Sequence, residues 1–480
     1  MSSVRTIAKN SIFLAGSSAL SLILGFFYAV YTARYLGAEG YGTIAFALSL
    51  CAIFGVLMDL GLSQLAIRDI SRDKSISDKY FFNIIAFKFI LVLLTLLIIV
   101  VTMNITSPNN SDSIKVVYII ALSTSLASFN GAFGFVFQSH EKMEYTSIGT
   151  TLNGIIMLLG ALLAINQRFS LIGFAFIYLL ANIVSIGYSF IIFATKFFKT
   201  RARIDVGIWK ALLIEAMPFG FTGLFVSMFY WLATVMLSYS KGNEVVGWYN
   251  AAYRLIMILL ILPQILNTAL FPVMSNFYMN SSDKFRFIQL KSFKYMMVLA
   301  LPIGVGTTIL ADRIISMIFG PAFSNSVIAL RILIWSTVII FIGSPFSNVL
   351  AASNRQMVVA KITAFCAIEI VLLNLLVLPK FSYIGASFTT VTVVLTSTLV
   401  SIFASFRMGY AIPKEGLTLT IKVILASVLM GIFVVCLGQL NLFLIISAAA
   451  IFYFIVSYLL SVFDKDDIKI FRNILIGAES

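Results

Sequence analysis

The sequence predicts an all-α integral membrane protein with fourteen transmembrane helices. Twelve of them are expected to form two parallel six-helix lobes around a central cavity, and two further helices follow at the C-terminus. Three observations support this fold class. The chain has 480 residues, of which 60% are hydrophobic and only 11% charged. Apolar runs of about 20 residues, the length that crosses a bilayer as a helix, recur along the whole chain. Basic residues gather at alternate ends of these runs.

The first run follows a short polar and basic N-terminus and extends to about residue 33, which is too long for the core of a cleaved signal peptide. It is therefore expected to be the first membrane helix. The three cysteines all lie inside apolar runs, where they are typical of small core residues and cannot form a disulfide framework. The predicted spans are roughly 11–33, 42–66, 80–103, 114–138, 145–165, 170–195, 209–239, 245–272, 290–311, 325–352, 358–379, 382–406, 418–438 and 441–463.

The distribution of lysine and arginine between the loops predicts the orientation. Of the 33 basic residues, 24 fall on the side that carries both termini and six on the opposite side. Because cytoplasmic loops carry the basic excess, both termini are expected on the cytoplasmic side. The protein itself is expected in the cell membrane. The net charge of +14 is then explained by topology and by anionic lipid, and no nucleic-acid partner is expected.

A weak internal repeat predicts the domain organisation. An even-numbered unit of six spans returns the chain to its starting side, so the two lobes should be parallel and related by a two-fold axis along the membrane normal. A substrate cleft is expected between the lobes. The predicted domains are 1–205, 206–410 and 411–480, the last holding helices 13 and 14. The matched segments are 39–42 with 244–247, 139–143 with 353–357, and 170–173 with 382–385.

The most informative stretch is 245–272, an apolar run that carries one full charge, Arg254. A lone guanidinium inside a bilayer costs at least roughly 2.5–3.5 kcal/mol on insertion scales, so it is expected to face the protein interior or a water-filled cavity. The alternative is an arginine whose head extends to the outer headgroups.

Three other cations within the spans complete the predicted substrate-binding set with Arg254: Arg34, Lys88 and Arg331. Arginine suits phosphate because its planar donors form a fork and it stays charged. The arginines lie in the outer half of the predicted topology, and Lys88 could extend the path inward. For Arg34 and Lys88, a purely structural ion pair or an interfacial position is an equally good interpretation.

The carboxylates within the spans are candidates for ion coupling. Asp59, Glu369 and Glu215 could pair with these cations or bind a proton or Na⁺, which would be the only cofactor expected. Glu215, near a span end, could equally be interfacial. Pro218 and Pro263 should bend spans seven and eight and are candidate gate residues, although static kinks are the simpler alternative.

Other chemistry is not indicated. The sequence has no P-loop motif, and its single histidine, His140, falls in a predicted loop, so no catalytic or metal site is expected. The segment 464–467 (Asp-Lys-Asp-Asp) has the spacing of a glycosyltransferase D-x-D motif, but no domain is present to hold a sugar nucleotide. We expect it to be a solvated charge run.

Several motifs resemble those of the Wzx-type polysaccharide flippases of the multidrug/oligosaccharidyl-lipid/polysaccharide (MOP) exporter superfamily. They are Ala33-Arg-Tyr-Leu-Gly37, Glu39-Gly-Tyr-Gly42, Asp59-Leu-Gly-Leu62 and Gly247-Trp-Tyr-Asn-Ala-Ala-Tyr-Arg-Leu255. Arg34 and Arg254 match the pattern best. The resemblance implies a cavity open alternately to each side and a transporter rather than an enzyme. It implies a polyprenyl-(pyro)phosphate-linked oligosaccharide as cargo, membrane lipid as surroundings, and glycan polymerase or glycosyltransferase partners.

Two other functions stay open. A cation-coupled multidrug exporter of the same superfamily would usually have twelve spans and an acidic cavity. A membrane glycan polymerase or ligase would usually carry a long outer loop, and none of the predicted outer loops exceeds about a dozen residues.

Overall fold

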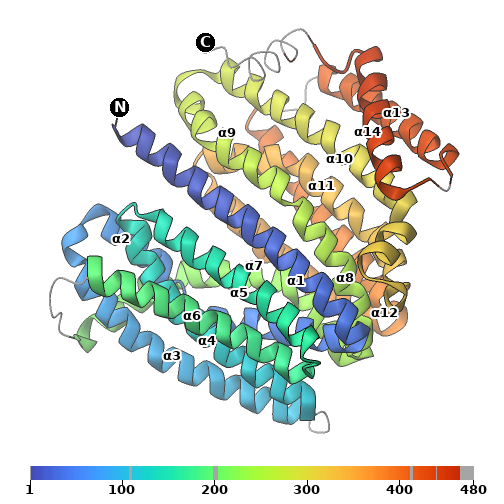
Figure 1. Ribbon diagram of the computed structural model, residues 1–480. Coiled ribbons are helices and arrows are strands. Elements are labelled where there is room, and N and C mark those ends of the chain that lie inside the picture. The colour runs from blue at the N-terminus through green and yellow to red at the C-terminus, as the bar shows by residue number, and fades with distance from the viewer. Residues whose placement is uncertain are drawn as a thin grey trace. The chain divides into compact units, whose positions relative to one another are not determined.

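The computed structural model describes residues 2–106, 111–197, 204–410, 414–438, 440–464 and Asp467, and this part of the chain is helical throughout (Figure 1). The long helices are α1 (Ser2–Gly55), α3 (Ser77–Thr106), α4 (Ser111–Ser139), α5 (Met143–Asn166), α6 (Leu171–Lys196), α7 (Trp209–Lys241), α8 (Asn243–Leu259), α9 (Ile261–Asn280), α10 (Ser282–Ile318), α11 (Ser326–Ala352), α12 (Gln356–Arg407), α13 (Lys414–Cys436) and α14 (Leu442–Leu459). Shorter elements are η1 (Val56–Met58), α2 (Leu62–Arg72), η2 (Lys74–Ile76), η3 (Val206–Ile208) and η4 (Pro321–Phe323).

The chain forms two compact units. The first contains residues 1–261, 319–326 and 363–390, and the second contains 262–318, 327–362 and 391–480. The predicted repeat boundaries near residues 205 and 410 stay a prediction, because compactness reports contacts and not internal repetition.

Twelve helical segments among the described residues are long and apolar enough to cross a membrane, so the protein is a multi-pass membrane protein. Two of them are interrupted. Helix α1 has a non-helical residue at Gly37 (φ 71°), and α12 has one at Ser382 (φ 53°). The left-handed φ is readily reached by glycine, whereas serine reaches it at a cost. Gly37 lies between predicted spans one and two, and Ser382 opens predicted span twelve.

The structure corrects one predicted span. Span 42–66 does not continue as one helix, because α1 ends at Gly55 and the chain turns through η1 and Gly61 (φ 85°) into α2. Asp59 therefore lies in a turn and not inside a membrane helix. Span 245–272 lies within one candidate membrane span, Asn243–Asn280, in which a turn at Leu260 separates α8 from α9. Pro263 sits in the first turn of α9, where its missing N–H costs little. Helix α7 continues through Pro218.

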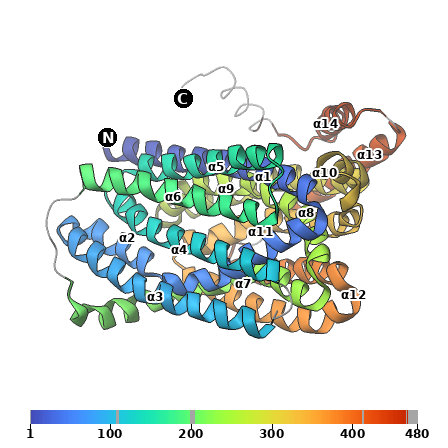
Figure 2. The ribbon, with the colours of Figure 1, turned by 60° about the horizontal axis from the view of Figure 1, so that its bottom comes forward.

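In the first unit, α3, α4, α5 and α6 lie side by side in both views (Figures 1 and 2). The amphipathic α2 buries one face against these helices. Its buried residues follow helical spacing, and they pack with a cluster of aromatic rings in which Phe81 and Phe193 stack at 4.0 Å. This packing fixes the turn before α2. The buried face consists of Leu62, Leu65, Ala66 and Ile70.

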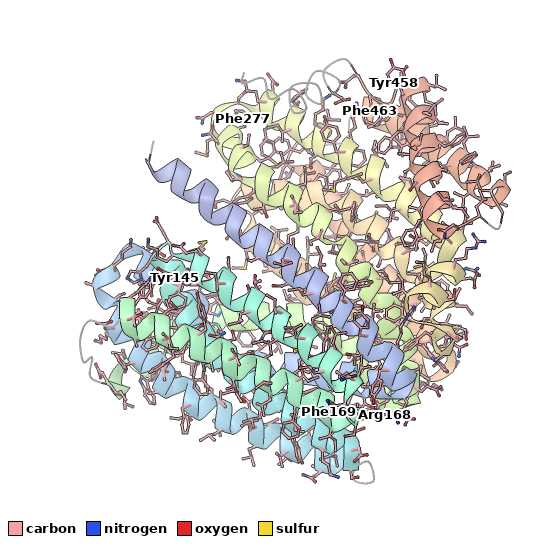
Figure 3. The ribbon with its side chains drawn as sticks, viewed as in Figure 1. Tyr145, Arg168, Phe169, Phe277, Tyr458 and Phe463 are labelled. Atoms are coloured by element: carbon pink, nitrogen blue, oxygen red, sulfur yellow. The ribbon has the colours of Figure 1, made fainter. Side chains whose placement is uncertain are left out.

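The two ends of the α5–α6 pair carry the residues expected at a membrane interface. Tyr145 lies at one end of α5, and Arg168 and Phe169 lie beyond its other end (Figure 3). Lys196, at the end of α6, donates a hydrogen bond of 2.8 Å to the Tyr145 hydroxyl. Tyrosine, lysine and arginine are typical of such interfaces.

Two glycines of the predicted repeat bring α1 and α8 into contact. A Cβ atom added to Gly42 would lie 2.7 Å from the backbone nitrogen of Gly247, and one added to Gly247 would lie 2.0 Å from the Ala38 carbonyl oxygen. Both are below any real Cβ contact, so a side chain at either position would force the helices apart. The matched segments 39–42 and 244–247 therefore pack directly against each other.

Candidate functional site

The first candidate site is a buried ion pair in the first unit. The ammonium of Lys88, on α3, lies 2.5 Å from Asp59 Oδ1, and the Lys88 side chain is only 1% exposed. Lys88 also donates hydrogen bonds to Ser63 Oγ (3.2 Å) and to the Ser128 carbonyl oxygen on α4 (2.9 Å). All three donor positions of the ammonium are thus used, as a buried lysine requires.

The carboxylate of Asp59 is held by the beginning of α2. Ser63 donates through its hydroxyl to Asp59 Oδ1 (2.6 Å) and through its backbone N–H to Asp59 Oδ2 (3.3 Å). Because a lysine and a hydroxyl both bind the charged carboxylate, its negative charge is compensated inside the protein. The turn before α2 thus supplies the carboxylate of the pair, Asp59, and α3 supplies the ammonium, Lys88.

A cavity of about 420 Å³ adjoins this pair. Helices α1, α2, α3, α4 and α7 all contribute to its wall, together with η1 and the turn that follows it. Small and polar side chains predominate, and the ion pair provides the only full charges in the lining. The lining residues are Cys51, Ala52, Gly55, Val56, Asp59, Gly61, Ser63, Gln64, Lys88, Thr124, Ala127, Ser128, Gly131, Phe219, Gly220 and Gly223.

Two glycines explain how α7 approaches this cavity. A Cβ atom added to Gly61 would lie 2.5 Å from the Ala216 carbonyl oxygen, and one added to Gly220 would lie 2.7 Å from the Leu60 carbonyl oxygen. The turn before α2 and the helix α7 therefore meet backbone to backbone. Gly220 follows Pro218 by two residues, so the Met-Pro-Phe-Gly motif marks a packing contact.

Glu215 lies on α7 outside the cavity lining. It forms an ion pair of 2.7 Å with Arg68 on α2, and its side chain is 59% exposed. Arg68 also contacts Asp69 at 2.7 Å. Burial by itself raises the pKa of Asp69, but the hydrogen bonds from Arg68 and Tyr80 lower it below its ordinary value. Glu215 thus belongs to a surface network between α2 and α7.

Arg254 forms a second candidate site, on α8. Its guanidinium lies against the backbone of α1, where a Cβ atom at Gly25 would be 2.7 Å from Arg254 Nη2. Two tyrosines lie near this charge: Tyr41 on α1, which is buried, and Tyr178 on α6, which is half-buried. Tyr178 in turn contacts Tyr28 edge to face, with ring centroids 5.3 Å apart. The arginine is half-buried in an aromatic environment inside the first unit.

No counter-ion holds this arginine within the part of the chain that the structure describes. Arg254 forms no ion pair and no hydrogen bond there. A half-buried guanidinium has five donors that need acceptors. The site therefore has the chemistry to bind an anion with several oxygen atoms.

None of the remaining predicted residues lines the cavity beside Lys88. Arg34 is exposed on α1, three residues before the break at Gly37. Arg331, in the second unit, is 45% exposed and pairs with Asp312. Glu369 is half-buried on α12. Sequence reasoning thus found both halves of the Lys88–Asp59 pair but missed Ser63, Ser128 and the tyrosines. Ser63 could have been found, since it follows Asp59 at i+4 next to a turn signal.

Comparisons with known proteins agree with this architecture. A family model described as polysaccharide biosynthesis protein matches residues 7–278, and the MatE family model matches residues 218–376. The probable flippase AglR of Haloferax volcanii is 28% identical over 193 residues, which are 39% of each chain. The chain thus spans about two fifths of the length of this relative. The putative O-antigen transporter of Escherichia coli K12 is 21% identical over 80% of this chain and 93% of its own length.

Solved structures share the fold. The lipid II flippase MurJ, in an inward closed conformation, has a TM-score of 0.77 and 15% identity, covering 97% of this chain and 100% of its own. A multidrug resistance MATE family transporter of the MOP superfamily has a TM-score of 0.63 and 16% identity, covering 81% and 94%. These names describe transport proteins, in agreement with the prediction of a transporter rather than an enzyme. The chain belongs to the polysaccharide biosynthesis protein family and has the fold of the MOP-superfamily transporters.

Proposed function

We propose that the protein is a flippase that moves a polyprenyl-(pyro)phosphate-linked oligosaccharide from the cytoplasmic to the outer leaflet by alternating access. The observation that carries the proposal is Arg254, a half-buried guanidinium without an anionic partner among the described residues. Its donor fork suits phosphate oxygens. The names of the relatives support the same class of cargo.

The cargo explains why such a protein is needed. A glycan and a pyrophosphate cannot cross about 30 Å of hydrocarbon unaided, because their polar groups would lose their hydration. The prenyl tail can stay in lipid while the head passes through the protein. We further propose that the product is used for surface polysaccharide assembly, next to glycosyltransferase or polymerase partners.

Transport in proteoliposomes tests this function. A fluorescent polyprenyl-pyrophosphate disaccharide in both leaflets should become fully accessible to a membrane-impermeant quencher when the protein is present, and only half accessible in empty vesicles. Imposed H⁺ and Na⁺ gradients test coupling, for which Glu369 is the better candidate because Asp59 is compensated by Lys88. Quenching equal to that of empty vesicles under every gradient would reject the flippase.

The MatE match favours one alternative, a multidrug exporter. The same vesicles distinguish it, because an exporter should accumulate cationic dyes and ignore the lipid-linked sugar. An arginine without a counter-ion would repel such dyes, so we expect no dye accumulation.

We also propose that α1 and α12 each cross the membrane twice, which gives fourteen crossings in two parallel lobes with both termini cytoplasmic. At 1.5 Å per residue, the 54 residues of α1 and the 52 of α12 are each about 80 Å long, far more than one crossing needs. The breaks at Gly37 and Ser382 would then lie at the outer surface.

Cysteine labelling tests the two crossings of α12. In a background with Cys436, the exposed native cysteine, replaced by serine, we expect Lys380→Cys to react with an impermeant reagent from outside. Lys361→Cys and Arg407→Cys should react only after permeabilisation. All three positions are exposed on the protein. Labelling of Lys361 and Arg407 from opposite sides would mean a single crossing.

A further inference from the structure

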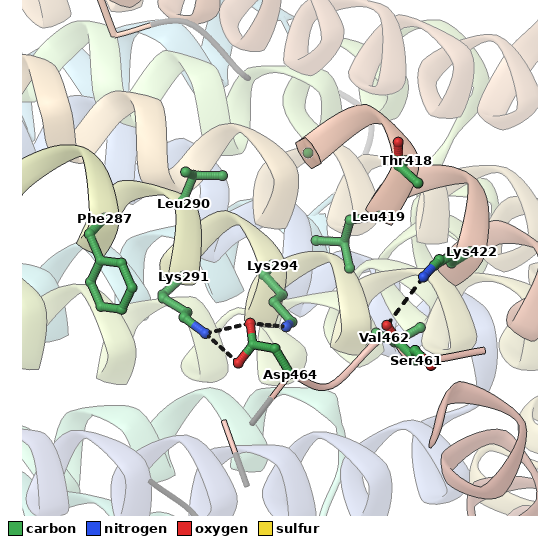
Figure 4. Close-up of a pocket in the computed structure, with 11 residues that line it drawn as sticks. Phe287, Leu290, Lys291, Lys294, Thr418, Leu419, Lys422, Ser461, Val462 and Asp464 are labelled. Atoms are coloured by element: carbon green, nitrogen blue, oxygen red, sulfur yellow. Dashed lines mark hydrogen bonds and ion pairs between the residues drawn. The ribbon is translucent and has the colours of Figure 1, made fainter. Parts of the chain in front are cut away.

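A second cavity of about 420 Å³ lies in the second unit, between α10, α13 and the segment after α14 (Figure 4). Three lysines contribute to its wall, from two helices. It is separate from both candidate sites, which belong to the first unit. The lining residues are Phe287, Leu290, Lys291, Lys294, Gly416, Thr418, Leu419, Lys422, Ser461, Val462 and Asp464.

One side of this cavity is an ion-pair cluster. Lys291 lies 2.8 Å from Asp464 and 2.6 Å from Asp467, and Lys294 pairs with both aspartates. Tyr295 donates a hydrogen bond of 2.8 Å to Asp467. Asp467 is fully buried, so the expectation of a solvated charge run in 464–467 is wrong for this residue. Aspartates that follow an apolar helix can be buried when a neighbouring helix offers lysines.

The two aspartates also bind each other's backbone. The Asp464 N–H donates to Asp467 Oδ2 and the Asp467 N–H donates to Asp464 Oδ1, both at 2.9 Å, in the reciprocal pattern of a capping box. Burial by itself raises the pKa of Asp464, but the hydrogen bonds from Lys291, the Asp467 backbone and Lys294 lower it below its ordinary value. Both carboxylates are therefore charged at neutral pH.

The charges within the cluster cancel, and the cavity wall carries one further lysine outside it. Two lysines balance two aspartates, and the third lysine, Lys422 on α13, forms no ion pair in the described part of the chain. Its only polar partner there is the Ser461 carbonyl oxygen, at 3.3 Å. In Figure 4, Lys422 approaches Ser461, away from the cluster around Asp464. The described residues in and beside the cavity thus have a net charge of about +1, which matches a singly charged anion.

Apolar side chains make up most of the rest of the cavity wall. Phe287 and Leu290 on α10, Leu419 on α13 and Val462 after α14 line it. The first halves of α10 and α13 and the end of α14 all belong to the predicted cytoplasmic side. A cation beside an apolar wall, at the depth of the inner leaflet, suits a molecule with a charged head and a hydrocarbon chain.

We propose that this cavity binds the phosphate group of an anionic phospholipid of the inner leaflet. Lys422 binds the phosphate oxygens, and the apolar residues contact the first part of an acyl chain. The Lys291, Lys294, Asp464 and Asp467 cluster forms the rigid floor of the site and joins the segment after α14 to α10.

Lipid binding to the purified full-length protein tests the proposal. Native mass spectrometry can count bound phosphatidylglycerol molecules over a titration, with phosphatidylcholine as the zwitterionic lipid. We expect phosphatidylglycerol to bind more tightly. Lys422→Gln should weaken that binding about tenfold, the size of one lost charge-assisted hydrogen bond. Asp464→Asn should strengthen it, because the net charge rises to about +2.

The matched control is Lys361→Gln, which removes the same charge from an exposed position on α12 in the same unit. It should bind phosphatidylglycerol as the unchanged protein does. The proposal fails if Lys422→Gln binds as tightly as the unchanged protein, or if Lys361→Gln loses as much. Glycerol phosphate and inorganic phosphate distinguish the source of the anion, and displacement of the lipid by either at equal concentration would indicate a soluble phosphate site instead.

Discussion

Cells that produce the Arg254→Ala variant are expected to insert the protein normally and to export no glycan. Arg254 lies against Gly25 inside the first unit, and no described residue neutralises it. If it binds the phosphate of the cargo, its loss removes charge-assisted hydrogen bonds worth about 1.5–3 kcal/mol each. Arg254→Lys should restore only part of the export, because an ammonium keeps the charge and loses the fork.

The measurement is cell-surface glycan at matched protein level, with Arg168→Ala as the control. Arg168 is exposed in the turn between α5 and α6, so its loss should leave export unchanged. If Arg254 only extended to the headgroups, glycan export should be nearly normal in Arg254→Lys and little reduced in Arg254→Gln. Export at the normal level in Arg254→Ala would show that this residue is not part of the site.

Replacing Asp59 by asparagine is expected to destabilise the protein by about 3 kcal/mol. The change leaves the ammonium of Lys88, which is 1% exposed, without its counter-charge, and breaking a buried pair typically costs about 3–5 kcal/mol. We expect a cost at the lower end of this range because the Asp59 side chain is 27% exposed. Unfolding in mixed micelles measures the change. Asp59→Asn combined with Lys88→Met should recover most of the loss, since no buried charge remains.

The Arg68–Glu215 pair is the internal control. It joins α2 to α7, and its side chains are 37% and 59% exposed, so Glu215→Gln should cost no more than about 1 kcal/mol. An Asp59→Asn, Lys88→Met double variant as unstable as Asp59→Asn alone would contradict the role of the pair.

Transport by a stable double variant then separates function from structure. Normal flipping would mean that the pair only supports the fold, whereas lost flipping would mean that the cargo or a coupling ion uses it.

The candidate sites could be predicted only in part, and the reason is their geometry. Lys88 and Asp59 were recognisable because full charges are rare in apolar runs, yet their pairing depends on a turn at Gly61 that ends the predicted span early. The tyrosines around Arg254 come from α1 and α6, and nothing in their local sequence relates them to α8. Asp467 was misinterpreted because its burial depends on lysines more than 170 residues away in the chain.

The sequence by itself determined that this is a multi-pass helical membrane protein and to which superfamily it is similar. Those properties follow from local rules: the length of apolar runs, the positions of glycine and proline, and the alternation of basic loops. Only the tertiary structure decided which charges are compensated. It pairs Lys88 with Asp59, Glu215 with Arg68 and Arg331 with Asp312, and among the described residues it gives Arg254 no counter-ion. The physical reason is that an ion pair depends on a few ångströms between side chains from separate helices, a distance set by how their faces pack and not by the residues beside each charge.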